Sequence, residues 1–548
     1  MASLGSALRL ARTVRHLRPG QIWHRIAFRL VRPKPDLAPP PGLRAGTGAW
    51  QRPAERRPSL VGPTRMRFLN VERDLAGPAD WDDPAVDKLW RYNLHYFEDL
   101  TASGHAGRSA WHSALLDRWV RENPPGFGTA WEPYPTSLRI VSWIKWALGG
   151  GALTPAQVHS LAIQARWLMG RLEYHLLGNH LFVNAKALVF AGLWFEGAEA
   201  EGWLDKGLEI LAREVPEQIL PDGGQFELSP MYHALALEDI LDLINIARAY
   251  PGQSLSRVQA AASAWTGLVP SMQRWLRLMC HPDGQIALFN DAAIDIAPSP
   301  AELDRYASDL GLVALPVGDG AILLPDSGYA RLATGEAVVI ADLARIGPDY
   351  LPGHAHADSL SFEMSLGSRR LIVNSGTSVY GTGPERHRQR GTAAHSTVLV
   401  AGQDSSETWS GFRVGRRARP RDVAVADQGE GLVARGAHDG YRFLARGALH
   451  ARAWTLAQGR LVVEDKVTAD LPAEARYHLH PDVVIRQDDR LSGALIFPDG
   501  RTLTWRARGA AARIEPGSWH PQFGQTFPSQ CLVIALVSGQ GALELNWD

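Results

Sequence analysis

The residues best suited to chemistry lie between positions 353 and 400, where three histidines occur near predicted strands. His354 and His356 are two positions apart, so an extended backbone places both imidazoles on one face, roughly 6–7 Å apart. Apolar and polar residues then alternate from 360 to 366, which is the period of a half-buried strand. A second apolar run ends at Asn374, and His395 opens a third. Three antiparallel strands are therefore expected to bring His356, Asn374 and His395 together beside His354, which favours a catalytic or metal site over scattered core histidines.

Polar residues also interrupt otherwise apolar helices in the first half of the chain. Asn179 and His180 open one such helix, where Asn179 equally suits an N-cap. Tyr232 and His233 begin another, after the turn-forming segment 222–227. Aromatic and polar groups that suit sugar binding, or packing in a core, are Tyr92, His95, Trp131 and Tyr134.

Length and composition limit the classes of protein that fit. A chain of 548 residues predicts two or more domains. The 57 basic and 57 acidic residues balance, so charge gives no indication of a nucleic-acid partner. Two cysteines, Cys280 and Cys531, do not make a disulfide framework or a cysteine metal site. Neither a transmembrane run nor the apolar core of a signal peptide is legible, which predicts a cytoplasmic or membrane-peripheral location.

The elements that must position these residues change character along the chain. Residues 1–35 carry eight basic residues and no acid, which predicts a basic amphipathic arm that contacts a membrane surface or docks on its own domain. A proline-rich connector extends to 63. Helical periodicity then predicts an (α/α) toroid or helical solenoid over 64–315, and short β-branched runs predict an antiparallel β-sandwich over 316–548. The predicted helices cover 84–100, 108–122, 135–148, 155–177, 180–196, 201–216, 228–250, 255–279 and 301–310.

Six motifs, in this order, resemble the heparinase II/III-like polysaccharide lyases and the related alginate lyases. They are YNLHYFEDL, GNHLFVNAKAL, DGGQFELSPMYH, GHAHADSLSFE, the NSGT turn and AAHSTVLV, and together they span about residues 80 to 420. The resemblance implies an (α/α) toroid followed by an antiparallel β-sandwich. It also implies an acidic polysaccharide as substrate and a periplasmic location.

The resemblance also implies roles for individual residues. Asn179 and His180 would neutralise the uronate carboxylate, Tyr232 would act as acid and base, and His354 as base. The positions of a structural zinc site fall on His356, Asn374 and His395. The family has an aspartate where this chain has Asn374, and an amide is a poorer zinc ligand than a carboxylate. Further predicted substrate contacts are His233, Arg386 and Arg390, the arginines being equally compatible with a solvated surface.

Three functions stay open at this point. The first is a lyase that removes the C5 proton of a uronate and expels the C4 oxygen, with either Tyr232 or His354 as base. The second is a glycoside hydrolase, which needs two facing carboxylates. Its candidates are Glu132, Asp222, Glu227 and Asp291. The third is a non-catalytic or biosynthetic partner in exopolysaccharide assembly.

Overall fold

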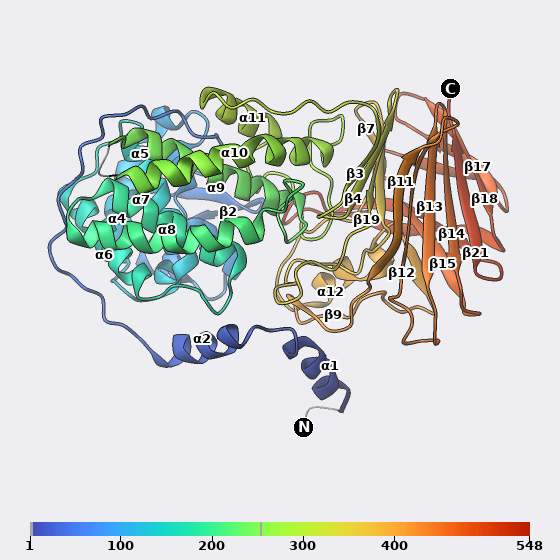
Figure 1. Ribbon diagram of the computed structural model, residues 1–548, viewed down its shortest axis with the longest axis horizontal. Helices are drawn as coiled ribbons and strands as arrows, with labels where there is room; N and C mark the ends of the chain where they lie inside the picture. Colours follow the sequence, from blue (N-terminus) through green and yellow to red (C-terminus); the bar gives the residue numbers. More distant parts are fainter. Residues whose placement is uncertain (1–3, 253–254) are drawn as a thin grey trace.

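The computed structural model describes residues 4–252 and 255–548, and it consists of a helical half packed against a half made of sheets (Figure 1). The helical half is an (α/α) toroid, and the sheets form an antiparallel β-sandwich, as the sequence predicts. The toroid contains α3 (Lys88–Leu94), α4 (Ser109–Glu122), α5 (Pro133–Leu148), α6 (Pro155–Met169), α7 (Gly178–Trp194), α8 (Ala198–Gln218), α9 (Pro230–Ala249), α10 (Ser256–Leu278) and α11 (Pro300–Asp309).

Two of the predicted helices are shorter in the structure. The helix predicted over 84–100 is reduced to α3, because Phe97 adopts a left-handed backbone conformation and only a single 3-10 turn follows it. The helix predicted over 155–177 ends at Met169, where Gly170 forms the C-cap. Both breaks open short loops at the rim of the toroid.

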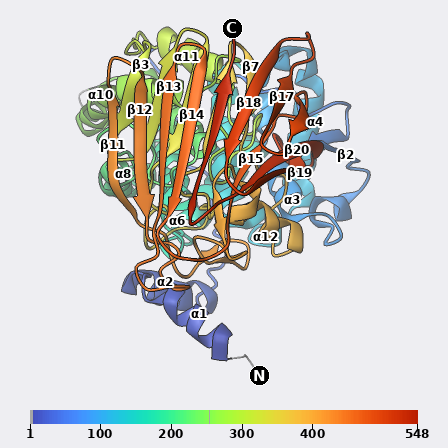
Figure 2. The same ribbon diagram turned by 90° about the vertical axis from the view of Figure 1, so that its right-hand side faces the viewer.

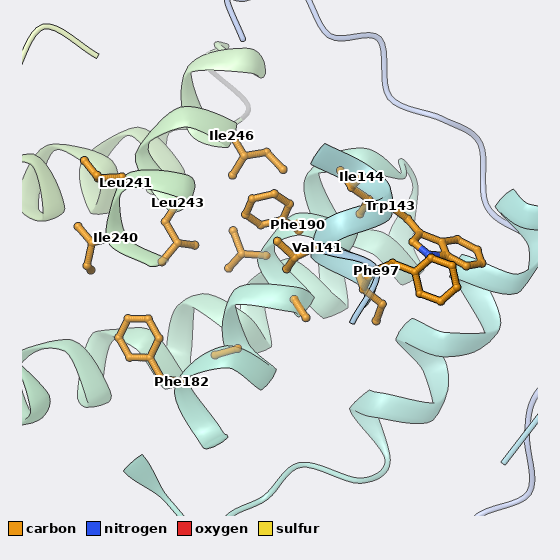
Figure 3. Close-up of a cluster of buried hydrophobic side chains, with 14 of the residues drawn as sticks. Phe97, Val141, Trp143, Ile144, Phe182, Phe190, Ile240, Leu241, Leu243 and Ile246 are labelled. Carbon is orange, nitrogen blue, oxygen red and sulfur yellow. The ribbon is translucent and has the colours of Figure 1, made fainter. Parts of the chain in front are cut away.

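Helix α7 lies at the centre of the helical half and packs on α5, α8 and α9. Its residues from 181 to 193 are all buried, with the polar Asn184 and Lys186 among them, so α7 is covered by neighbouring elements on every side. Figure 3 shows Phe190 of α7 beside Val141 of α5 and Ile246 of α9, and Phe182 of α7 near Ile240 of α9. This packing fixes the N-termini of α5, α7 and α9 relative to one another, and the polar residues of the site lie near those N-termini.

The second half contains three main antiparallel sheets. One has the order β3 (Gly320–Leu324), β4 (Tyr329–Thr334), β5 (Ala337–Asp342), β6 (Phe362–Leu366), β7 (Arg369–Ile372). The largest, shown face-on in Figure 2, has the order β11 (Pro420–Asp427), β12 (Leu432–His438), β13 (His450–Ala457), β14 (Arg460–Val467), β21 (Gln540–Asn546), β18 (Thr502–Arg508), β17 (Ser492–Ile496), β16 (Val484–Asp489). The third has the order β19 (Ala511–Trp519), β20 (Phe527–Ala535), β15 (Ala473–His478), β8 (Val398–Val400).

The three strands predicted around the histidines do not form one sheet. β6 and β7 pair as expected, but β8 pairs with β15 in a different sheet. His354 and His356 lie in the loop before β6 and not on a strand. The histidines still meet, because this loop folds back against the short helix α12 (Pro384–Arg390) and the segment that leads into β8.

An apolar cluster joins the two halves. It packs Trp275 of α10 and Leu228, which precedes α9, against Tyr329 and Phe289. The Tyr329 hydroxyl donates a 2.6 Å hydrogen bond to the Leu228 carbonyl oxygen. This contact anchors the start of α9 to the sandwich. Asn290 donates to the same Leu228 carbonyl oxygen, so the loop around Asn290 is held beside the start of α9.

The N-terminal arm, defined here as residues 4–35, contains α1 (Leu4–Val14) and α2 (Pro19–Leu30). Both views place it at one end of the molecule, below α12 and the helical half (Figures 1 and 2). The connector then runs extended along the toroid to the small hairpin of β1 (Arg65–Phe68) and β2 (Val71–Asp74). A second hairpin, of β9 (Thr408–Trp409) and β10 (Arg413–Val414), lies near α1.

Candidate active site

A cavity inside the toroid is lined by residues near the N-termini of α5, α7 and α9. Its wall includes Tyr134 from α5, Asn179 and Phe182 from α7, and Tyr232 from α9. Asn179 and Tyr232, which the sequence places 53 positions apart, thus face the same space. Every residue on its wall belongs to the segment 56–242, so the cavity lies on the helical side, and the Tyr232 side chain reaches from it to His354 and Tyr380 of the second half.

Asn179 and His180 lie in the first turn of α7. Asn179 does not cap the helix as predicted, because the helix starts at Gly178 and Leu177 occupies the N-cap position with a positive φ of 65°. The His180 Nδ1 lies 3.2 Å from a carboxylate oxygen of Glu173, and its ring packs 4.5 Å from the ring of Tyr134. Burial opposes the charged imidazole, but the Glu173 carboxylate outweighs burial and raises the pKa of His180. Glu173 thus favours the protonated form of His180, which stands beside the Asn179 amide.

Tyr232 is held by the start of α9, where the hydroxyl of Ser229 accepts a hydrogen bond from the Tyr232 N–H. The Tyr232 hydroxyl lies 3.1 Å from the hydroxyl of Tyr380, and its ring stacks 4.0 Å from the ring of His354. Burial raises the pKa of Tyr232 well above its usual value, and the neighbouring Tyr380 adds to this shift. The phenol is therefore protonated at neutral pH and suited to donate a proton.

His354 is oriented by Asp291. Its Nδ1 lies 2.9 Å from one carboxylate oxygen of Asp291, and its Nε2 lies 3.6 Å from Glu227. An ionised carboxylate only accepts hydrogen bonds, so in the neutral ring Nδ1 carries the hydrogen and Nε2 keeps its lone pair. The lone pair is on the side away from Asp291, which suits a general base.

Asp291 is fully buried and contacts Arg386, His354 and His356. Its two carboxylate oxygens accept hydrogen bonds from the two terminal nitrogens of Arg386, one of them at 2.6 Å. The oxygen that does not contact His354 also lies 2.8 Å from Nε2 of His356. Burial opposes its charge, but the Arg386 guanidinium and the hydrogen bonds from the two histidines hold the pKa of Asp291 well below its usual range. One ionised carboxylate therefore orients two imidazoles. The sequence offered Asp291 only as a possible hydrolase carboxylate.

A cluster that fits a metal ion lies behind His354. Donor atoms of His356, Asp358 and His395 all lie within 4.8 Å of one another, and all three residues are buried. The Nδ1 of His356 and the Nε2 of His395 are buried without a hydrogen-bond partner. The other nitrogen of each ring has a partner. His356 contacts Asp291 through Nε2, and His395 contacts the Asn374 side-chain oxygen through Nδ1. Both free nitrogens thus hold lone pairs, the arrangement of a metal-binding histidine with a supporting second contact.

The predicted ligand set changes in one residue. Asp358, in the GHAHAD motif, supplies the carboxylate of the cluster, whereas Asn374 orients His395 through a 3.1 Å contact. The substitution of an amide for an aspartate at 374 therefore leaves a donor set of two imidazoles and one carboxylate, which is a common zinc set.

Several predicted substrate contacts lie in the core. His95 is bonded to the Trp81 carbonyl and the Trp119 indole, and Trp131 packs beside the same Trp119. His233 is fully buried between the Gln225 N–H and the Met272 carbonyl. These three side chains have almost no surface to offer a sugar, so the prediction that they bind substrate is wrong and they stabilise the rim instead.

The two arginines are neither solvated nor on a simple turn. Arg386 and Arg390 lie on α12 and are fully buried. Arg386 is paired with Asp291, and Arg390 donates to the carbonyl oxygens of Ala355 and Gly411. They hold the histidine loop in place, which corrects the prediction that they contact an acidic sugar.

Tyr92 and Tyr134 are partly exposed and form a row of aromatic rings that leads to His180. The ring centroids of Tyr92 and Tyr96 lie 6.5 Å apart, and those of Tyr96 and Tyr134 lie 6.0 Å apart. The Tyr92 hydroxyl donates to the Glu132 carboxylate. Tyr380, which sequence reasoning missed, extends the aromatic wall on the sandwich side. Its only sequence signal is an aromatic residue shortly after the NSGT turn.

Comparison with known families agrees with this geometry. The description "Heparinase II/III N-terminus" matches residues 80–305, and "Heparinase II/III-like, C-terminal" matches residues 317–548. The chain belongs to the heparinase II/III-like family. The crystal structure of heparinase III has the same fold, with a TM-score of 0.65 over 88% of this chain and 79% of that chain at 18% identity.

Individual relatives of this heparinase II/III-like chain differ in what they do. A heparin-sulfate lyase from Bacteroides stercoris is 24% identical over 382 residues, which cover 60% of this chain and 56% of the relative. The chain thus spans little more than half of that lyase. FtsZ-localized protein C from Caulobacter vibrioides is 28% identical over 537 residues, which cover 90% of this chain and 86% of that protein.

Proposed function

We propose that this protein is a polysaccharide lyase that cleaves a uronate-containing acidic polymer by β-elimination. The observation that carries the proposal is the position of Tyr232, which lines the cavity together with Asn179 and packs its ring 4.0 Å from the ring of His354. An amide, a phenol and an imidazole are the groups that this reaction requires. Relatives named heparin-sulfate lyases support the same reaction class.

In the proposed reaction, His354 removes the C5 proton. Its Nε2 is the nitrogen free to accept, since Nδ1 is engaged by Asp291. Tyr232 then protonates the departing C4 oxygen, because its raised pKa keeps the phenol protonated. The electron pair of the C5–H bond becomes the C4–C5 double bond as the C4–O bond breaks. Tyr380, 3.1 Å from the Tyr232 hydroxyl, positions the phenol and offers a route for its reprotonation.

The carboxylate of the uronate must take up negative charge as the C5 proton leaves. Asn179 and His180 supply an amide donor and an imidazole whose protonated form is favoured by Glu173, at one helix start where the helix dipole also favours an anion. One well-placed donor of this kind contributes about 3–4 kcal/mol to a transition state.

A metal bound by His356, Asp358 and His395 would be structural. We propose zinc, because two imidazoles and a carboxylate suit it. Bound there, it would supply cross-linking of the histidine loop to the segment before β8, and proton transfer would stay with Tyr232 and His354.

The charges of the cavity narrow the proposed substrate. Its cations Arg56, Lys145 and Lys186 are each paired with a carboxylate of α9. The carboxylates on this wall are Glu98, Glu238, Asp239 and Asp242. Four carboxylates against three cations leave little attraction for sulfate groups. We therefore propose a uronate polymer with few or no sulfates on the sugar that enters this cavity.

The experiment is incubation of the protein with a panel of uronate polymers of graded sulfation. Ultraviolet absorbance from the new C4–C5 double bond is the expected signal, strongest with unsulfated polymers. New reducing ends without that absorbance would instead identify a hydrolase. The hydrolase is disfavoured by Asp291, which is buried in an ion pair, and by Asp222, which accepts hydrogen bonds from Ser327.

A second candidate is a non-catalytic partner that holds a polymer or assembles with other proteins. It is favoured by the likeness to FtsZ-localized protein C, which covers a larger share of this chain than the lyase relatives do. Binding of a uronate polymer without any product, by wild type and by Tyr232→Phe alike, would select this function.

A further inference from the structure

The outer face of α2 exposes a stripe of large apolar side chains. Ile22, Ile26 and Leu30 recur every fourth residue and are 43%, 49% and 76% exposed, with Trp23 beside them at 66%. Residues spaced by four lie on one face of a helix. A continuous exposed stripe of this size on a surface helix points to a docking surface.

The orientation of this stripe is fixed by contacts on the opposite face of α2. Phe28 packs 4.2 Å from the ring of His175 and lies under the guanidinium of Arg171. The Gln21 side chain is buried and donates to the Tyr350 carbonyl oxygen. α2 is thus held by one face against the toroid and against Tyr350 of the second half, and its apolar stripe points away from the protein.

α1 is attached to the sandwich half in a similar way. Arg12 donates to both carboxylate oxygens of Glu407, at 3.0 and 2.8 Å, and the Thr13 hydroxyl accepts from the Trp409 indole. Leu8, Leu10 and Val14 stay 39–51% exposed. The N-terminal arm therefore bridges the two halves while presenting apolar residues outward along its length.

The charge around the stripe is positive. Arg25, Arg29 and Arg32 are exposed on α2 and just beyond it. A second cluster forms a small pocket beside α1. It is lined by Arg15, His16, Arg416, Arg417, Arg419, Asp439 and Arg442. Glu407, Asp349 and Asp439 pair with Arg416, Arg417 and Arg442, so five arginines face three carboxylates and leave an excess of positive charge for anionic groups.

We propose that the N-terminal arm docks the protein on an anionic lipid bilayer. Ile22, Trp23, Ile26 and Leu30 enter the boundary between headgroups and acyl chains, and the arginines of α2 and of the pocket beside α1 contact lipid phosphates. An apolar stripe flanked by arginines on a fixed helix is the pattern of an in-plane membrane helix. In the part of the chain that the structure describes, no helix has the length and apolar character to span a bilayer, so the contact is peripheral.

A bilayer fits better than a folded partner, because the apolar and cationic groups are spread over the whole arm. Both views show the arm at one end of the molecule with α1 and α2 projecting beyond the two halves (Figures 1 and 2). Docking there leaves the helical and sheet halves on one side of the membrane. The inference does not depend on whether the protein is a lyase.

The test is sedimentation of the full chain with vesicles of phosphatidylcholine alone or mixed with phosphatidylglycerol. Binding to the phosphatidylglycerol vesicles is expected, with at least tenfold weaker binding to the neutral ones. Ile22→Asp/Ile26→Asp should lose at least tenfold in binding. Arg25→Glu/Arg29→Glu should lose about fivefold per charge and show a weaker salt dependence. The matched control is Val313→Asp, since Val313 is an 81% exposed apolar residue outside the arm, and it should bind like wild type.

Three results would overturn the proposal. They are absence of vesicle binding by wild type, equal binding to neutral and anionic vesicles, and wild-type binding by Ile22→Asp/Ile26→Asp. Because all the altered side chains are exposed, unchanged melting temperatures should accompany every variant. Retention on a soluble sulfated polymer that Arg25→Glu/Arg29→Glu abolishes, without vesicle binding, would assign the face to a polyanion and also reject the bilayer.

Discussion

Replacing Asp291 with asparagine removes the charge that orients the candidate base. Asp291 accepts Arg386 through both carboxylate oxygens, His354 at 2.9 Å and His356 at 2.8 Å. Asparagine has a nearly identical shape but offers one oxygen and one NH2 group. At least one donor of Arg386 and one histidine N–H then face another N–H, so the variant retains the volume and loses the acceptors.

The expected cost is large, because the ion pair is fully buried. Asp291 and Arg386 have no exposed side-chain surface, and removing one partner of such a pair costs about 3–5 kcal/mol. Activity should also fall, since His354 loses the contact that orients its ring. In the unrelated Ser-His-Asp triad of serine proteases, the same change of aspartate to asparagine lowers kcat about 10⁴-fold. Stability and activity should therefore fall together.

Urea unfolding of wild type and Asp291→Asn measures the stability, and double-bond absorbance measures activity. The matched control is Asp488→Asn, which breaks an exposed ion pair with Arg486 and should change neither. The pKa of Asp291 is lowered, so its contribution is present above its unfolded value of about 3.9 and is lost only as pH falls through the lower folded value. The stability gap should therefore stay constant from pH 5 to 8. If Asp291→Asn were as stable as Asp488→Asn, the conclusion that Asp291 holds Arg386 and the two histidines in place would be refuted.

Three further outcomes are expected. Tyr232→Phe should lower kcat about 10²–10⁴-fold while KM changes little, measured by double-bond absorbance, and an unchanged kcat would remove the phenol from the mechanism. Added zinc should raise the melting temperature of the metal-free protein and fail to do so in His356→Ala; an equal rise in both would place the metal elsewhere. The raised pKa of His180 means that its charge is complete below about pH 6.5 and is lost as pH rises through the higher folded value. Glu173→Gln should therefore move the loss of substrate affinity to lower pH, and an unmoved profile would argue against His180 as the carboxylate's partner.

The predictable part of the fold came from periodicity. The apolar spacing of α9 predicted a helix, and the alternation over 360–366 predicted a strand. The predicted half-burial of that strand was wrong, because Ser361, Glu363 and Ser365 are buried as well and β6 is covered on both faces. Those patterns are local, so the toroid and the sandwich were foreseen together with most element positions. Helix ends were less predictable, because the stop after Met169 and the break at Phe97 depend on single backbone conformations.

The candidate site was only partly predictable. Asn179, Tyr232 and His354 were found because polar residues at the starts of apolar helices and a paired histidine motif are unusual in a sequence. His95 and His233 were misassigned, since a buried histidine that bonds backbone carbonyls has the same sequence signal as one facing a ligand. Exposure distinguishes them, and exposure depends on neighbouring elements.

The sequence by itself determined the order of a helical half and a sheet half, the residue types of the proposed reaction, and the basic and apolar character of the arm. Tertiary structure decided that Asp291 orients both His354 and His356, that Asp358 completes the metal cluster, and that the apolar stripe of α2 faces outward. The reason is physical. Burial patterns are encoded in short stretches of chain, whereas the partner of a charge is chosen by packing between segments more than 60 residues apart.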